Sequence, residues 1–191
     1  MSYIIQNFDD KIAKLLQNGG VGFMPTDTIY GLSCRALDQS AVKRLHQVKN
    51  RDSRPFIILI SSINQLHELG LIAGDFGPAL GYWPGKLSVI GKADRAPEYL
   101  HMGTKTLAVR QPDYPELLGL INKTGPLVST SANLSGQEPA HSLADAQKIF
   151  GDKLDFYVDV GPIDAQPSTI VKTSFAKLKV IRQGEVKINE I

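Results

Sequence analysis

Helix-like and strand-like segments alternate along almost the whole chain, and this alternation constrains the fold more than any other feature of the sequence. The helix-like segments carry apolar residues every three or four positions, whereas the strand-like segments are short apolar runs bounded by turn-forming residues. The predicted helices span residues 9–19, 38–49, 61–70, 114–125 and 142–151. The predicted strands span residues 21–24, 56–60, 86–90, 106–109, 126–129, 156–160, 168–171 and 178–181. The alternation predicts an α/β fold with one twisted sheet and flanking helices. Because the last three strands have no helix between them, we expect that sheet to be mixed. We expect a ligand cavity at the sheet's edge.

The length and composition of the chain favour a single globular domain. The 191 residues contain no linker-like segment, so we expect one domain over residues 1–187 and a short tail over residues 188–191. The one cysteine, Cys34, excludes an internal disulfide. The sequence has no signal-peptide pattern and no apolar run long enough to cross a membrane, so we expect a cytoplasmic protein without membrane partners. The formal net charge of +2 permits an anionic ligand without requiring one.

Several common catalytic motifs are missing from the sequence. The chain contains neither the P-loop pattern nor the dinucleotide-binding pattern G-x-G-x-x-G, and it has no H-E-x-x-H motif. Its four histidines do not have the spacing of metal ligands, and no Ser-His-Asp arrangement can be recognised. We therefore expect neither a metal held by the protein nor a covalent nucleophile.

Polar side chains cluster directly after two of the predicted strands. Residues 25–31, PTDTIYG, occupy a position where open α/β sheets bind ligands, beyond the carboxyl end of a strand. The same residue types are ordinary turn formers, and the sequence alone leaves both interpretations open. In the segment STSAN, the side chains of Ser129, Ser131 and Asn133 alternate onto one face if the chain is extended. Burying such groups without partners would cost about 1–3 kcal/mol each, so they face water, backbone or a ligand.

Three cations gather at the end of the predicted helix 38–49. They are Lys49, Arg51 and Arg54. Cations at this position often only offset the helix macrodipole and are then solvated. However, Lys49 and Arg51 lie two residues apart and would face the same side of an extended chain. A lysine ammonium beside an arginine guanidinium suits a polyphosphate ligand.

Seven short motifs, in the same order, resemble those of the YrdC family. The motifs are PTDTIYGL, KNR, WPG, LAVRQP, STSANLSG, PSTIV and IRQG, and together they extend across nearly the whole chain. The similarity is strongest to the single-domain YrdC/TsaC-type threonylcarbamoyl-AMP synthases. The K-x-R pair of that family corresponds to Lys49 and Arg51, and its S-x-N pair corresponds to Ser131 and Asn133.

The resemblance implies an enzyme of transfer RNA modification. Such an enzyme condenses L-threonine, bicarbonate or CO2, and ATP into L-threonylcarbamoyladenylate and releases pyrophosphate, with Mg2+ accompanying the ATP. A partner complex would then transfer the threonylcarbamoyl group to adenosine 37 of transfer RNA. The chemistry needs no protein nucleophile, because the carbamate formed from threonine and CO2 itself attacks the α-phosphate.

The resemblance also implies roles for individual residues. Lys49 and Arg51 would be the catalytic residues that hold the triphosphate. The implied ATP-binding residues are Lys49, Arg51, Ser131, Asn133 and Arg182. The implied threonine-binding residues are Thr28, Arg110, Ser129 and Ser168, with Arg110 as the partner of the carboxylate.

Two other functions are compatible with parts of the sequence. YrdC-like domains also resemble modules that bind double-stranded RNA without catalysis. The basic residues of such a surface would be Lys49, Arg51, Arg54, Lys86, Arg110 and Lys172. The family more often has an acidic residue in place of Lys172, and the net charge of +2 is modest for an RNA-binding module. Carbamoyl-adenylate chemistry, as in hydrogenase-maturation carbamoyltransferases, fits less well, because those chains carry zinc-finger cysteines and this chain has one cysteine.

Overall fold

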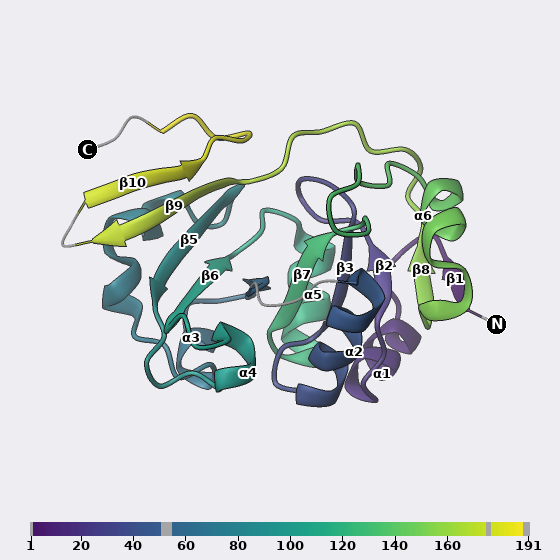
Figure 1. Cartoon of the computed structure of the whole chain (residues 1–191), viewed down its shortest axis with the longest axis horizontal. Coiled ribbons are helices and arrows are strands. Elements are labelled where there is room, and N and C mark those ends of the chain that lie inside the picture. Colours follow the sequence, from purple (N-terminus) through teal and green to yellow (C-terminus); the bar gives the residue numbers. More distant parts are fainter. Residues whose placement is uncertain (1, 51–54, 175–176, 189–191) are drawn as a thin grey trace.

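One ten-stranded sheet runs through the whole molecule (Figure 1). The computed structural model describes residues 2–50, 55–174 and 177–188. The strands are β1 (Tyr3–Ile5), β2 (Gly22–Met24), β3 (Gly31–Arg35), β4 (Ile57–Leu59), β5 (Leu87–Lys92), β6 (Thr106–Arg110), β7 (Leu127–Ser131), β8 (Phe156–Val158), β9 (Thr169–Ser174) and β10 (Lys177–Arg182). Their order across the sheet is β1-β8-β2-β3-β7-β4-β6-β5-β9-β10. Parallel pairs such as β4 with β6 occur beside antiparallel pairs such as β3 with β7, which confirms the predicted mixed sheet.

Short helices connect the strands, and the sequence signals their ends. The α-helices are α1 (Asp10–Gln17), α2 (Gln39–Lys49), α3 (Gln65–Glu68), α4 (Glu98–His101), α5 (Pro115–Thr124) and α6 (Leu143–Phe150), and the 3-10 helices are η1 (Ala73–Tyr82) and η2 (Gly151–Lys153). The carboxylate of Asp9 accepts a hydrogen bond from the backbone N–H of Ile12 at 2.8 Å and so caps α1. The carboxylate of Asp38 caps α2 in the same way, through the N–H of Ala41 at 3.0 Å.

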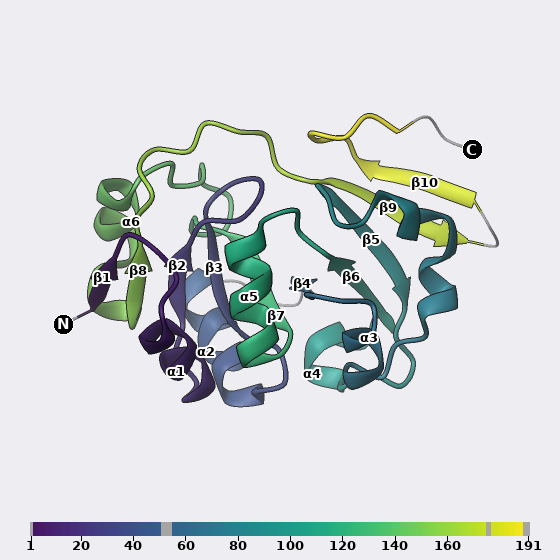
Figure 2. The same cartoon turned by 180° about the vertical axis from the view of Figure 1, so that it is seen from behind.

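The helices leave part of one sheet face open. Helices α1 and α5 pack together over one face, where Ile12, Leu16, Leu117 and Ile121 are fully or almost fully buried (Figure 2). Helix α2 packs against β3, and η1 packs against β5, β9 and β10. The face of β5, β6 and β9 that is turned toward the viewer in Figure 1 carries no helix. No helix in the described ranges is both long and apolar enough to span a membrane.

Most predicted elements are present, and the differences have local causes. All predicted strands and helices have counterparts, although the predicted helix 61–70 is helical only over the four residues of α3. Strands β1 and β3, helix α4 and the 3-10 helices were not predicted. The residue Ile188, at the start of the predicted tail, is 7% exposed and belongs to the main core cluster. Residues 189–191 lie outside the described part of the chain.

Candidate functional site

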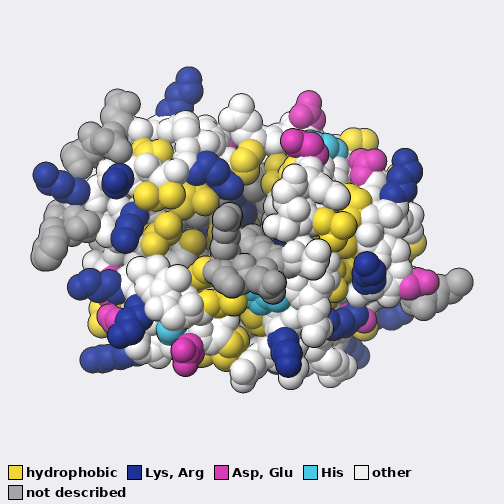
Figure 3. Space-filling view, in the orientation of Figure 1, with side chains coloured by type: hydrophobic (Ala, Val, Ile, Leu, Met, Phe, Trp, Pro, Cys, Tyr) yellow, Lys and Arg dark blue, Asp and Glu magenta, His cyan; other side chains and the backbone are white. Residues whose placement is uncertain are grey.

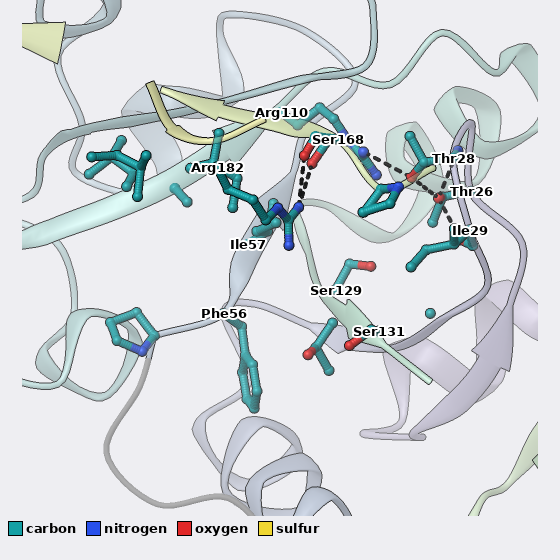
Figure 4. Close-up of a pocket in the computed structure, with 18 of the residues that line it drawn as sticks. Thr26, Thr28, Ile29, Phe56, Ile57, Arg110, Ser129, Ser131, Ser168 and Arg182 are labelled. Atoms are coloured by element: carbon teal, nitrogen blue, oxygen red, sulfur yellow. Dashed lines mark hydrogen bonds between the residues drawn. The ribbon is translucent and has the colours of Figure 1, made fainter. Parts of the chain in front are cut away.

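A cavity of about 360 Å3 lies on the helix-free face of the sheet (Figure 4). Its wall includes Thr26 and residues 28–31, which follow β2, and parts of β4, β5, β6, β7, β9 and β10. Thr106, Ala108 and Arg110 all line the cavity, and these alternate residues of β6 point to the same side of the sheet. The cavity therefore lies over one face of the sheet and extends to its edge strand β10, which contributes Ile181 and Arg182.

The cavity is lined by polar residues that are far apart in the sequence. All four residues that the family resemblance assigns to threonine line it, and so do two of those assigned to ATP. These six residues are Thr28, Arg110, Ser129, Ser131, Ser168 and Arg182. Figure 4 shows them on different strands and loops around one space. The sheet thus concentrates hydroxyl and guanidinium groups that the chain separates by as much as 154 positions, from Thr28 to Arg182.

Arg110 is the most deeply buried cation of the cavity wall. Its Nη1 donates a hydrogen bond to Thr28 Oγ1 at 3.1 Å, and its Nη2 lies 3.2 Å from a carboxylate oxygen of Asp27. Burial lowers the pKa of Arg110, the charge of Asp27 opposes that shift, and the nearby cation Arg182 adds to it. The Nε–H of Arg110 has no hydrogen-bond partner among the described residues. This group is therefore a buried cation with a donor still available.

A second guanidinium, that of Arg182, also lines the cavity. Arg182 Nη2 donates a hydrogen bond to the backbone oxygen of Ser168 at 2.7 Å. The hydroxyl of Ser168 lies 2.9 Å from the hydroxyl of Ser88, beneath the cavity wall. Burial also lowers the pKa of Arg182. With two arginines in one cavity, the site is suited to an anionic ligand.

Lys49 forms a hydrogen-bonded cluster beside the cavity. It is the last residue of α2 and is 2% exposed. Its Nζ donates to the backbone oxygen of Ser131 and to Asn133 Oδ1, both at 2.6 Å, and Ser131 Oγ donates to the same Asn133 oxygen at 2.7 Å. Lys49 and Asn133 do not line the cavity, but Ser131 does. The predicted residues Arg51 and Arg54 lie outside the described residues.

The floor of the cavity is apolar and contains a necessary glycine. Ile57, Ile90 and Ile170 line it from β4, β5 and β9. A Cβ atom on Gly31 would lie 2.9 Å from Ser129 Oγ, so a larger residue there would collide with that hydroxyl. Sequence analysis did not assign the three isoleucines to the site, because apolar residues in strands are more often buried in the core. The side of the sheet that each isoleucine faces becomes clear only once the pairing of the strands is known.

The four described residues of the predicted RNA-binding surface do not form a continuous exposed surface. Lys49 and Arg110 are buried, and Lys86 Nζ pairs with Glu185 at 3.2 Å. Among the predicted residues in the described ranges, only Lys172 is both exposed and without an ion pair. The prediction grouped these cations by sequence motif, whereas their strands direct them into different environments. As for metals, the described ranges contain no group of three or more His, Cys, Asp or Glu side chains that could hold an ion.

Comparisons with known proteins agree with this fold. Two relatives named threonylcarbamoyl-AMP synthase are each 35% identical to this chain. The one from Pseudoalteromonas translucida aligns over 164 residues, which cover 81% of this chain and 87% of the relative. The one from Halorhodospira halophila aligns over 151 residues, which cover 76% of this chain and 79% of the relative. The crystal structure of P. abyssi Sua5 complexed with L-threonine superposes with a TM-score of 0.84 at 28% identity, over 96% of this chain and 57% of Sua5. The sequence model of the Sua5/YciO/YrdC family, described as "Telomere recombination", matches residues 14–184. The chain therefore belongs to the Sua5/YciO/YrdC family.

Proposed function

We propose that this chain is a threonylcarbamoyl-AMP synthase. It condenses L-threonine, bicarbonate or CO2, and ATP into L-threonylcarbamoyladenylate and pyrophosphate, and the product serves the modification of adenosine 37 in transfer RNA. One observation carries the proposal: the four residues assigned to threonine, Thr28, Arg110, Ser129 and Ser168, line the same cavity. The relatives that carry this activity in their names, and the threonine-bound Sua5 structure, support it.

The threonine substrate lies at the Arg110 end of the cavity. The guanidinium of Arg110 has an unused Nε–H, and a planar guanidinium is well suited to bind a carboxylate through two hydrogen bonds. The hydroxyls of Thr28, Ser129 and Ser168 surround this end and bind the amine and the side-chain hydroxyl of the substrate. Uncharged hydroxyls position these groups without competing with Arg110 for the carboxylate.

ATP lies on the side of Ser131, Asn133 and Arg182. Lys49 and Arg51 neutralise the triphosphate, and Mg2+ enters with ATP as part of the substrate. Ser131 and Asn133 bind phosphate or ribose oxygens. The bonds from Lys49 Nζ to Ser131 and Asn133 support this role, because they hold the lysine beside the cavity before ATP arrives.

The reaction proceeds by positioning and charge stabilisation. The threonine amine, once deprotonated, adds to CO2 and forms a carbamate. A carbamate oxygen then attacks the α-phosphate of ATP, the bond to the β-phosphate oxygen breaks, and pyrophosphate leaves with the electron pair. Fixed cations stabilise the charge that develops on the phosphates, and fixed geometry supplies much of the remaining rate increase.

Product formation tests the proposal directly. The protein is incubated with ATP, L-threonine and bicarbonate, and threonylcarbamoyl-AMP is detected by mass spectrometry. Asn133→Ala removes an acceptor of Lys49, so we expect at least a ten-fold lower rate, equivalent to about 1.5–3 kcal/mol for a hydrogen bond to a charged group. Asn122→Ala, at an exposed position of α5, is the matched control and should retain full activity. A wild-type protein that forms no product would overturn the proposal.

A specific observation favours RNA as a further partner of this synthase. Four exposed lysines lie on the side of the sheet that carries the cavity. We call this group the lysine face, and it consists of Lys92, Lys172, Lys177 and Lys179. Lys179 is directly opposite Lys172, and like charges in that arrangement are destabilising unless a ligand compensates them. Within the described residues none of the four forms an ion pair. Figure 3 shows basic side chains around an apolar area on this side of the molecule. We propose that transfer RNA phosphates contact the lysine face in the cytoplasm, where a transfer complex uses the product.

A further inference from the structure

Asp27 and Arg110 form a buried ion pair behind the cavity wall. The side chains are 2% and 5% exposed, and the closest charged atoms lie 3.2 Å apart. Arg110 lines the cavity, whereas Asp27 does not. The second carboxylate oxygen of Asp27 accepts a hydrogen bond from the backbone N–H of Asp113 at 3.2 Å. Asp27 therefore contacts the loop after β6 and the cation, but it does not line the cavity.

The pair is incompletely hydrogen-bonded on both sides. Asp27 Oδ1 faces Arg110 Nη2 without hydrogen-bond geometry, and Arg110 Nε has no acceptor among the described residues. Buried polar groups are normally fully bonded, because an unpaired buried group keeps its full desolvation cost. An exception at a cavity wall indicates that Arg110 retains binding capacity for a ligand, while Asp27 balances its charge in the absence of that ligand.

We infer that Asp27 is a positioning residue that acts through Arg110, as an internal counter-ion that makes the empty site stable and limits its affinity for the substrate carboxylate. This inference rests on the proposed function, in which Arg110 binds the carboxylate of threonine.

A thermodynamic cycle gives the sign of the effect. Without the charge of Asp27, the empty protein contains a buried cation with no counter-charge, which is a costly state. The free energy of the threonine-bound protein rises less, because the substrate carboxylate places a negative charge beside Arg110. The mutation therefore raises the free energy of the empty protein more than that of the complex. Threonine consequently binds more tightly to a protein that is itself less stable.

A purely structural role for Asp27 predicts the opposite result. If the carboxylate mattered only because it ties the loop after β2 to the N–H of Asp113, its loss would loosen the cavity. All amino-acid ligands would then bind more weakly, whether or not they carry a carboxylate. L-threoninamide, which differs from threonine by the loss of the negative charge, separates the two possibilities.

The test compares Asp27→Asn with the wild type. Asparagine keeps the size and one oxygen acceptor but removes the charge. Calorimetry gives the dissociation constants of L-threonine and L-threoninamide, and thermal unfolding gives stability. We expect a lower unfolding temperature, at least five-fold tighter binding of threonine, and no tighter binding of threoninamide. Asp10→Asn, which removes a carboxylate from an exposed ion pair with Lys123, is the matched control and should change neither affinity.

Each alternative outcome has a distinct meaning. If the wild type fails to bind threonine, the proposed function fails, and this inference fails with it. If the wild type binds threonine and Arg110→Met does not, but Asp27→Asn binds both ligands equally or more weakly than the wild type, the inference alone is overturned. If Asp27→Asn is unfolded by itself, threonine should restore the folded circular dichroism spectrum and threoninamide should not. Failure of that rescue would also overturn the inference.

Discussion

Three cations at or beside the cavity are each held in a different way, and two of them, Lys49 and Arg110, are buried. Arg110 faces a carboxylate, Lys49 donates to two oxygens of the STSAN segment, and Arg182 donates to a backbone carbonyl. Transfer of an ion from water into a protein interior costs several kcal/mol even after relaxation. An anionic ligand would offset this cost for Arg110, which lines the cavity, and for Lys49, which lies beside it. The charge distribution therefore supports a nucleotide and an amino acid as ligands.

Lys49→Met tests the nucleotide end of the cavity. Methionine fills a similar volume, so it removes the ammonium with little change in packing. Loss of hydrogen bonds from a charged group should weaken ATP binding by about 1.5–3 kcal/mol, which is roughly a factor of 10 to 150. The measurement is ATP calorimetry alongside thermal unfolding, with the exposed Lys43→Met of the same helix as control. Unchanged ATP affinity in a folded Lys49→Met protein would contradict the assignment.

For single residues, the sequence predicted which side chains line the cavity better than it predicted which side chains contact one another. Thr28, Arg110, Ser129 and Ser168 were placed near a ligand because their motifs resemble a known family, and all four line the cavity. Asp27 lies within the same PTDTIYG cluster but received no role. Its partner Arg110 is 83 positions away, and nothing local to either residue indicates that their side chains meet.

The helix α2 links local sequence to the site. Asp38 caps its first turn, and Lys49 is its last residue, followed by Asn50 in the left-handed conformation that ends the helix. The position of the Lys49 ammonium thus depends on where this helix begins and ends. The helix packs on the sheet through buried residues such as Leu45, so the cap and the packed face act together.

Asp38→Ala should destabilise the protein without abolishing its fold. Loss of a side-chain N-cap typically costs 0.5–2 kcal/mol, and we expect about 1 kcal/mol of unfolding free energy here. Urea unfolding followed by circular dichroism measures it. Asp38→Ser retains a capping oxygen and should recover most of the loss. An alanine variant as stable as the wild type would mean that packing, and not the cap, determines where α2 begins.

Elements with local signals were predictable, and elements defined by distant partners were not. The caps of α1 and α2 are encoded within four residues, and the sequence identified both helices. Strand β3, GLSCR, reads as the continuation of a turn because it contains Gly, Ser and Arg. Its strand character comes from pairing with β2 on one side and β7 on the other. Strand β1 likewise exists because it pairs with β8, more than 150 positions away.

The whole molecule presents two cationic regions, both suited to anions, on one side of the sheet. The cavity is lined by the guanidiniums of the buried Arg110 and the exposed Arg182, and the lysine face lies on the neighbouring strands β5, β9 and β10. The register connects them: Ile90 and Ile170 line the cavity, and Lys92 and Lys172 follow two residues later on the same side of the same strands. A polyanion bound to the lysine face would therefore lie close to the opening through which substrates enter and product leaves.

The salt dependence of RNA binding distinguishes the lysine face from the cavity. Each lysine–phosphate contact releases counterions, so the logarithm of the binding constant falls with the logarithm of salt concentration by about 0.7–0.9 per contact. For Lys172→Gln with Lys179→Gln, we expect the slope for transfer RNA to decrease by about 1.5–2, and threonine and ATP affinities to stay unchanged. Filter binding across a potassium chloride series measures the slope. The exposed pair Lys14→Gln with Lys148→Gln, on helices α1 and α6, removes the same charge elsewhere and should leave the slope unaltered. Equal slopes for both double variants would show that net charge alone, and not the lysine face, attracts RNA.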